Sequence, residues 1–264
     1  MTTTITQAVS TPRAAGSGKR QPRRPRPTTF PPTARLHVWL MLALTLSTGI
    51  VDAVGYLGLD RVFTGNMTGN VVMLGMALTG ADDLPIVGPI LALACFFVGA
   101  MFSGRLHRGR KDGWSSPTTV VFGLVAVILF LTAVALFFFG KNAFAHMPEV
   151  ITSILGLVMG MQAAAARHVK VADVTTVVVT STITWLAADS RFAAAREQPW
   201  ARRLLAIVLI LLGAVIGAGL LQFGMWLPVL ISSLVTSAAL LLGHRRSRTE
   251  QREASHEASQ GASS

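Results

Sequence analysis

Apolar segments alternate with short polar connections along most of the chain. Two stretches, 120–140 and 204–243, contain no charged residue at all. Runs of 18 or more apolar residues are typical of transmembrane helices. The pattern therefore predicts an all-α membrane protein whose polytopic domain covers residues 35–243. Eight apolar segments follow one another, at 36–59, 62–80, 85–104, 118–140, 149–168, 174–189, 203–223 and 226–243.

Two of these segments differ from the others. The segment 62–80 is rich in glycine, and the segment 174–189 is short. A straight helix needs about 20 residues to cross a bilayer. Both segments also carry polar side chains, which are costly in hydrocarbon unless they bond to one another or line a cavity. We expect both to be re-entrant or broken rather than to cross the membrane.

The distribution of charge supports this interpretation. The chain is 52% hydrophobic and 13% charged, with a net charge of +11. Loops rich in Lys and Arg face the cytoplasm, so an even number of crossings must separate consecutive basic clusters. This condition is met if six of the eight segments cross the membrane and both termini are cytoplasmic. The alternative has eight full crossings and leaves one basic loop outside. All Lys and Arg residues except Arg61 and Lys141 fall in clusters at 13–35, 105–111, 167–170, 191–203 and 245–252.

The tails at 1–34 and 244–264 are polar, and the first has no acidic residue. Neither can bury a core, so both are expected to be disordered cytoplasmic tails. The Arg and Thr content of residues 1–34 also resembles an organellar transit peptide, which is an alternative interpretation. Since the positive charge lies in loops and tails, it is explained by membrane topology. We therefore expect the lipid bilayer as a partner and no nucleic acid.

Asp52 is the acidic residue that lies deep within a long apolar segment. A buried carboxylate without a partner is costly, so intramembrane acids are often functional. Asp52 could carry a proton or bind a cation. The alternative is a structural hydrogen bond near a membrane interface, since Asp60 follows soon after.

A polar motif follows Asp52 in the glycine-rich segment, with Thr64, Asn66, Thr68 and Asn70 at alternate positions. In a helix, positions 64 and 68 share one face and positions 66 and 70 another. These side chains indicate a polar cavity. The spacing of Gly65 and Gly69 also permits close helix packing, which is the alternative role of the motif.

A related pattern returns in the second half of the chain. Thr176 and Thr180 match Thr64 and Thr68 at an offset of 112 residues, and Gln162 stands near the position that corresponds to Asp52. Matching polar segments in two halves are typical of transporters with inverted repeats. We predict repeat units at about 36–105 and 149–223 with a site between them. The candidate residues for a substrate or ion are Asp52, Tyr56, Thr64, Asn66, Thr68, Asn70, Gln162, Thr176 and Thr180.

Signatures of catalysis are missing from the sequence. No nucleophile elbow, phosphate-binding loop or zinc-protease motif occurs, and the six His residues and the single Cys95 show no metal-ligand spacing. We therefore expect no enzymatic activity, no metal and no cofactor. Transport of a small solute is the favoured function. The alternatives are a channel, a scaffold or sensor that transports nothing, and, least favoured, a membrane-embedded enzyme.

The run Gly49-x-x-Asp52-Ala53-Val54-Gly55-Tyr56, followed by Phe63, Met67-Thr68-Gly69-Asn70 and Leu74-Gly75, resembles the YoaK family of bacterial membrane proteins. Gly160-Met161-Gln162 and the pair Thr176 and Thr180 are similar to its second half. The chain departs from the family pattern at Ala163 and Ser181. The resemblance covers about residues 36–243 and implies a location in the bacterial plasma membrane. It implies no substrate, because the family is one of unknown function.

Overall fold

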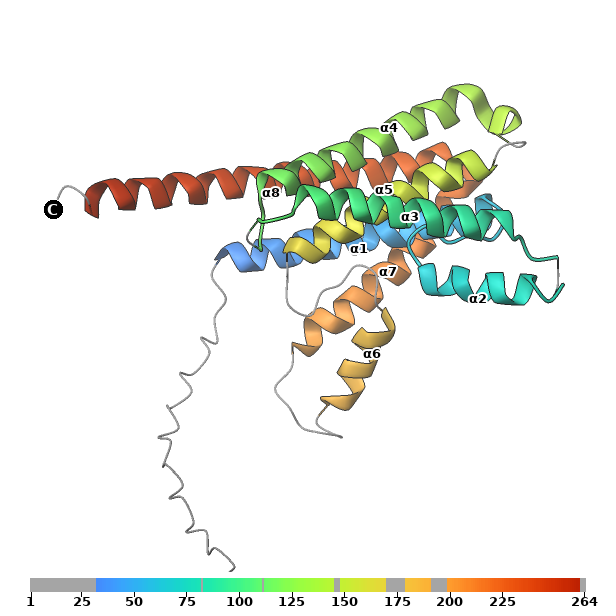
Figure 1. Cartoon of the computed structure of the whole chain (residues 1–264), viewed down its shortest axis with the longest axis horizontal. Coiled ribbons are helices and arrows are strands. Elements are labelled where there is room, and N and C mark those ends of the chain that lie inside the picture. Colours follow the sequence, from blue (N-terminus) through green and yellow to red (C-terminus); the bar gives the residue numbers. More distant parts are fainter. Residues whose placement is uncertain are drawn as a thin grey trace, which may run out of the picture. The chain divides into compact units, whose positions relative to one another are not determined.

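The computed structural model describes residues 32–81, 83–110, 112–144, 148–169, 179–190 and 199–261. Within these ranges the regular structure is helical (Figure 1). Residues 1–31 of the tail expected at 1–34 lie outside the described residues, and so does the candidate Thr176, whereas residues 32–34 belong to the first helix. The helices are α1 (Pro32–Gly58), α2 (Met67–Ala77), α3 (Val87–Leu106), α4 (Ser116–Phe144), α5 (Pro148–Val169), α6 (Val179–Ala188), α7 (Trp200–Leu220) and α8 (Trp226–Gly261), with a short 3₁₀ turn at Leu221–Phe223.

Six of the described helices are long and apolar enough to cross a membrane, namely α1, α3, α4, α5, α7 and α8. The two others, α2 and α6, have 11 and 10 residues, which is too short for a crossing. They occupy the two segments that the sequence singled out as polar and unlike the rest. The prediction of an all-α membrane protein is confirmed, and the number of described helices that are long and apolar enough to cross agrees with the six predicted crossings.

Glycines allow α1 and α7 to pack with their backbones almost in contact. A Cβ atom on Gly49 would lie 2.3 Å from the carbonyl oxygen of Ile210, and one on Gly213 would lie 2.2 Å from that of Leu46. One turn further along α7, a Cβ on Gly217 would meet the backbone of Ile50 at 2.6 Å. Residue numbers rise together along both helices, so the two helices run parallel. Small residues at such contacts are the usual means of helix association in lipid.

A second parallel pair, α3 and α5, is built in the same way. A Cβ on Gly160 would lie 2.1 Å from the carbonyl oxygen of Phe96, and one on Gly99 would lie 2.0 Å from that of Leu157. Gly156 approaches Ala92 one turn earlier. The two pairs are joined by a core in which α8 packs on α1 and α4, and α5 packs on α4. Its fully buried side chains include Leu44, Phe122, Leu129 and Leu155.

The C-terminal end differs from the sequence-based expectation. Residue 244 was expected to begin a disordered tail, but α8 continues from the membrane-spanning part as far as Gly261. Residues 244–261 consist largely of Arg, Glu, Gln, Ala and Ser and contain no proline. Most of these residues favour the helix, so the extension costs little conformational free energy once α8 has begun.

Imidazole rings gather where α3 and α5 end. His107, at the C-terminal cap of α3, is buried, and its ring centroid lies 4.3 Å from that of His168. Its Nδ1 is 2.7 Å from the Ser103 carbonyl oxygen, and its Nε2 is 3.1 Å from the Thr118 hydroxyl. A neutral ring satisfies both contacts by donating from Nδ1 and accepting at Nε2. Burial lowers the pKa of His107, and the nearby His168 ring lowers it further, while the bond to Ser103 acts in the opposite direction.

This site makes the stability of the protein depend on pH. Since the folded-state pKa of His107 lies below its unfolded value of about 6.5, the unfolded chain takes up the proton first. Its contribution to stability is complete above that value and is lost as the pH falls below it. We expect the apparent unfolding temperature to fall between pH 7.5 and pH 5.5, and to fall less in a His107→Gln variant. An equal fall in both proteins would contradict a role for His107.

Candidate functional site

The chain turns back along α1 after Gly58 instead of continuing into the next helix. Asp60 and Arg61 form the turn with φ angles of 59° and 60°, in the left-handed region. The chain then passes so close to α1 that a Cβ on Gly55 would lie 2.3 Å from the carbonyl oxygen of Val62. A Cβ on Gly65 would lie 3.0 Å from the Thr48 side chain. The returning segment therefore reaches the level of Thr48.

Thr48 lies near the middle of the membrane-spanning part of α1, which covers Leu36–Gly58. It is ten residues before Gly58, or about 15 Å along the helix axis at 1.5 Å per residue. Helix α2 begins at Met67, two residues after Gly65. The N-terminus of a short helix, preceded by irregular backbone, is thus placed level with the middle of α1.

Asp52 satisfies the backbone of this irregular segment. One of its carboxylate oxygens, Oδ1, accepts hydrogen bonds from the amide of Thr64 at 2.9 Å, the amide of Gly65 at 2.6 Å and the Thr64 hydroxyl at 3.2 Å. Backbone amides without a partner are costly where water is absent. The geometry therefore gives Asp52 the structural role of holding the helix break against α1.

Asn70 holds the same segment from the other side. Its Nδ2 donates to the carbonyl oxygen of Phe63 at 2.6 Å, and its Oδ1 accepts from the amide of Phe63 at 2.9 Å. The side chain is completely buried. A single amide thus replaces both backbone partners that Phe63 would have in a helix. Together, Asp52 and Asn70 satisfy three consecutive residues of irregular backbone.

The remaining motif residues lie near this break and are less enclosed. Asn66 is exposed and caps α2 by accepting from the amide of Gly69 at 3.3 Å. Tyr56 is 39% exposed, and its ring stacks on that of Phe63 with the centroids 5.0 Å apart. Since α2 begins only at Met67, Thr64 and Thr68 do not share a helix face as the sequence suggested. Thr64 is buried against Asp52, whereas Thr68 is exposed.

Gln162 reaches the break from α5 through Thr48. It is completely buried, and its Nε2 lies 3.4 Å from the Thr48 hydroxyl. In the part of the chain that the structure describes, its Oε1 accepts no hydrogen bond. Buried polar atoms normally have a partner, so this oxygen is an exception among the described residues. Thr48 was not among the residues selected from the sequence, although the polar run Thr45, Ser47 and Thr48 marks this part of α1.

The described parts of the two polar segments pack on different helices. Helix α2 packs on α3, and α6 packs on α7. Thr68 and Thr180 both have exposed side chains, and the Thr180 carbonyl oxygen accepts from Thr184 within α6. Among the described residues, Asp52, Thr64, Asn70 and Gln162 form one connected site through Gly65 and Thr48. No group of three or more His, Cys, Asp or Glu side chains that could hold a metal occurs in the described ranges.

Comparison with known proteins identifies the family of the chain. Residues 40–242 match the family described as Protein of unknown function (DUF1275). The chain is 33% identical over 217 residues to the UPF0700 transmembrane protein YoaK of Bacillus subtilis strain 168, an alignment that covers 77% of this chain and 94% of YoaK. No solved structure matches the chain. The chain is therefore a member of the DUF1275 family of membrane proteins, to which its Asp52 and Thr-Gly-Asn motifs already pointed.

Proposed function

We propose that this protein transports a small solute across the bacterial plasma membrane and that the solute passes the helix break held by Asp52. The observation that carries the proposal is the N-terminus of α2 beside Thr48, near the middle of α1. Irregular backbone at membrane depth is tolerated only where it is buried in protein or lines a water-filled cavity. Broken helices that end at the midplane are typical of solute sites in secondary transporters.

An inverted repeat is the second part of the proposal. We assign α1–α4 to one unit and α5–α8 to the other. Each unit then crosses the membrane three times, and because this number is odd, the second unit begins on the opposite side of the membrane from the first. The most extensive packing contacts between the described helices have counterparts under this exchange. Helix α1 packs on α7 as α5 packs on α3, α2 packs on α3 as α6 packs on α7, and α1 packs on α8 as α5 packs on α4.

The glycine contacts support the same correspondence at the level of residues. Gly49 meets Ile210 and Gly160 meets Phe96, at 2.3 and 2.1 Å. Gly213 meets Leu46 and Gly99 meets Leu157, at 2.2 and 2.0 Å. Because α8 packs on α1 as α4 packs on α5, we also assign α4 and α8 to the repeat units, which the units predicted at 36–105 and 149–223 left out.

The orientation of the protein follows from its basic residues. Arg105 lies in the last turn of α3, Arg108 and Arg110 follow the end of that helix, and Arg167 lies in the last turn of α5. These two helices are parallel, so their ends lie on the same side, which the positive-inside rule assigns to the cytoplasm. With six crossings, both termini then lie in the cytoplasm as well.

Within this proposal, Gln162 is the residue that contacts the solute. Its Oε1 is fully buried and accepts no hydrogen bond among the described residues, while Nε2 contacts Thr48. A solute with an N–H or O–H group would supply the missing donor. Since the oxygen has no protein partner, removing it should weaken solute binding more than it weakens the fold.

The experiment begins with a thermal-shift screen of purified protein against small polar solutes, since a molecule that binds the folded state raises its apparent stability. A solute found in this way is then tested for counterflow in proteoliposomes. We expect saturable exchange, and a loss of affinity of about 5-fold to 150-fold in Gln162→Leu, because an unpaired ligand donor costs about 1–3 kcal/mol. The apparent unfolding temperature of this variant should change little.

Gln222→Leu is the matched control, because Gln222 is exposed in the 3₁₀ turn after α7. It should bind and exchange solute like the unmodified protein. Flux that does not saturate would indicate a channel and contradict the transport proposal. Unchanged affinity in Gln162→Leu would contradict the assigned role of Gln162 alone.

A further inference from the structure

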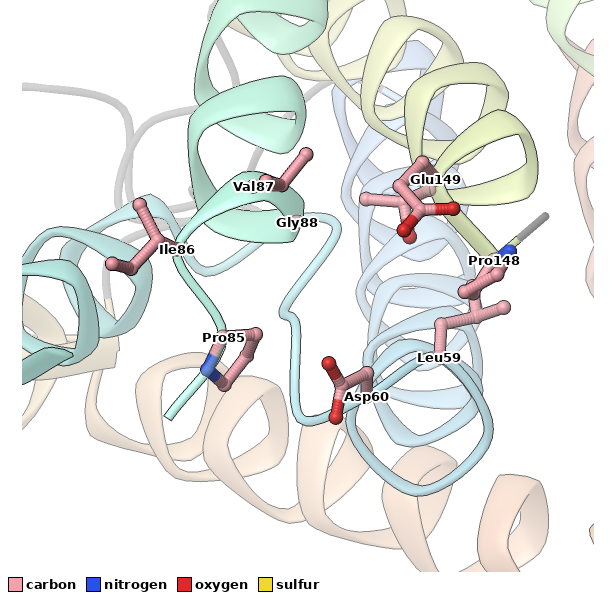
Figure 2. A pocket seen from close by; sticks show the side chains of 9 residues that line it. Leu59, Asp60, Pro85, Ile86, Val87, Gly88, Pro148 and Glu149 are labelled. Carbon is pink, nitrogen blue, oxygen red and sulfur yellow. The ribbon is translucent and has the colours of Figure 1, made fainter. Parts of the chain in front are cut away.

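A cavity of about 190 Å³ opens where α1 ends and where α3 and α5 begin. Figure 2 shows Asp60 on the chain that leaves α1, Glu149 on the first turn of α5, and the segment from Pro85 to Gly88 at the start of α3. The cavity is smaller than the pockets of about 300–1,000 Å³ that hold drug-sized ligands. It is large enough for several water molecules or a short aliphatic molecule.

The charge that lines this cavity is negative. Asp60 and Glu149 are both exposed and contribute two carboxylates, and no Lys or Arg is among the lining residues. Arg61 is adjacent in sequence but does not line the cavity. Although the starts of α3 and α5 lend some positive character, each helix terminus is equivalent to only about half an elementary charge. The two full charges therefore make the cavity attractive to cations.

Thr152 provides an independent sign of a ligand. It lines the cavity, its exposed fraction is 1%, and its hydroxyl makes no hydrogen bond within the described part of the chain. The neighbouring Ser153 follows the usual course and donates to the carbonyl oxygen of Glu149 at 2.7 Å. A buried hydroxyl that does not donate to a carbonyl oxygen of its own helix can form a hydrogen bond with a molecule in the cavity.

The remaining lining decides what kind of cation fits. Leu59, Pro85, Ile86, Val87 and Pro148 make part of the wall apolar. Calcium needs six to eight oxygen ligands, and magnesium needs octahedral geometry, whereas the side chains here offer two carboxylates and one hydroxyl. Quaternary ammonium groups are recognised by aromatic rings, and none lines this cavity. A primary ammonium group has three N–H donors for these oxygens, and its alkyl chain matches the apolar wall.

We propose that this cavity binds a small aliphatic primary amine in its protonated form, with Asp60 and Glu149 as charge partners and the Thr152 hydroxyl as a hydrogen-bond acceptor. The site lies at the end of the protein opposite the basic ends of α3 and α5. It is separate from the helix break, and its occupancy is measured by binding alone. The binding test of this cavity is therefore independent of whether the protein transports a solute.

The test is direct binding of radiolabelled butylamine at neutral pH to the full-length protein in nanodiscs of uncharged lipid. Saturable binding is expected, and Asp60→Asn and Glu149→Gln should each weaken it at least tenfold. Asn tolerates positive φ as Asp does, so the turn at residue 60 should be kept. Thr152→Val should weaken binding about fivefold, the loss expected for one neutral hydrogen bond.

Asp83→Asn is the matched control. Asp83 is exposed, lies in the connection between α2 and α3, and has a positive φ of 47°, but it does not line the cavity. Its replacement removes the same charge and should leave butylamine binding unchanged. The proposal is overturned if no saturable binding is seen, or if Asp83→Asn weakens binding as much as Asp60→Asn. Competition by tetramethylammonium or Mg²⁺ as strong as that by unlabelled butylamine would also overturn it.

Discussion

Replacement of Asp52 by leucine is expected to destabilise the protein by about 2–6 kcal/mol. The backbone amides of Thr64 and Gly65 would lose their shared acceptor, and each buried unsatisfied donor costs about 1–3 kcal/mol. The cost of placing a carboxylate in the bilayer does not offset this loss, because it applies equally to an inserted helix that has not yet packed. Thermal unfolding in detergent, followed by tryptophan fluorescence, would measure the effect. An unfolding temperature equal to that of the unmodified protein would show that Asp52 does not hold the helix break.

Asp52→Asn separates this structural role from a role in carrying protons or cations. Asparagine keeps an acceptor oxygen for Thr64 and Gly65, so a smaller loss of stability than in the leucine variant is expected. It also removes the titratable charge. If Asp52 carries a coupling proton, the pH dependence of solute binding or uptake should be lost in this variant while the fold survives. Unchanged pH dependence would leave Asp52 with the structural role only.

Gly99→Ala and Gly213→Ala should each destabilise the protein by about 3 kcal/mol, the upper end of the cost of overpacking. The added Cβ atoms would lie 2.0 and 2.2 Å from the carbonyl oxygens of Leu157 and Leu46. Backbone atoms cannot rotate away as a flexible side chain can, so the parallel helices would have to separate. If the inverted repeat is correct, the two substitutions should have similar effects, because they occupy corresponding contacts.

Each of these glycines has a matched control in its own helix. Gly104 lies in α3 with Gly99, and Gly219 lies in α7 with Gly213, and a Cβ on either control would meet no atom within 4 Å. Alanine at these two positions should leave the apparent unfolding temperature unchanged or raise it slightly, since alanine favours the helix. A comparable loss in the control variants would mean that helix propensity or lipid contact, rather than helix packing, explains the effect.

The fold class could be predicted because it depends on apolar length and on the location of basic residues. Both signals are large and local in the sequence. The sequence also indicated that the segments 62–80 and 174–189 differ from the others, and the helices described within them, α2 and α6, are short. The C-terminal extension of α8 was missed, since a polar tail of good helix formers has the same composition whether it is helical or disordered.

The residues of the candidate site could be predicted from the sequence, but their arrangement could not. The sequence identified Asp52, Thr64 and Asn70 as polar groups that needed partners. It did not indicate that those partners are the backbone of residues 63–65. In a continuous helix that backbone would bond within the helix and would need no side-chain partner. The start of α2 is determined by tertiary contacts, namely the close approach at Gly55 and the hydrogen bonds to Asp52. These contacts join residues that are apart in the sequence, so the local sequence does not predict where α2 begins.

The two parallel glycine contacts have a consequence for the synthesis of the protein. Helix α1 is made early, yet its closest partner, α7, is among the last parts of the chain to be made. In the same way, α3 leaves its glycine face unpaired until α5 has been inserted. A ribosome-bound chain that ends before α7 therefore holds α1 in the bilayer with a small-residue face open to lipid or to other proteins. Between the insertion of α1 and that of α7, another helix can pack on this face in place of α7. We expect membrane chaperones to bind the chain mainly during this period.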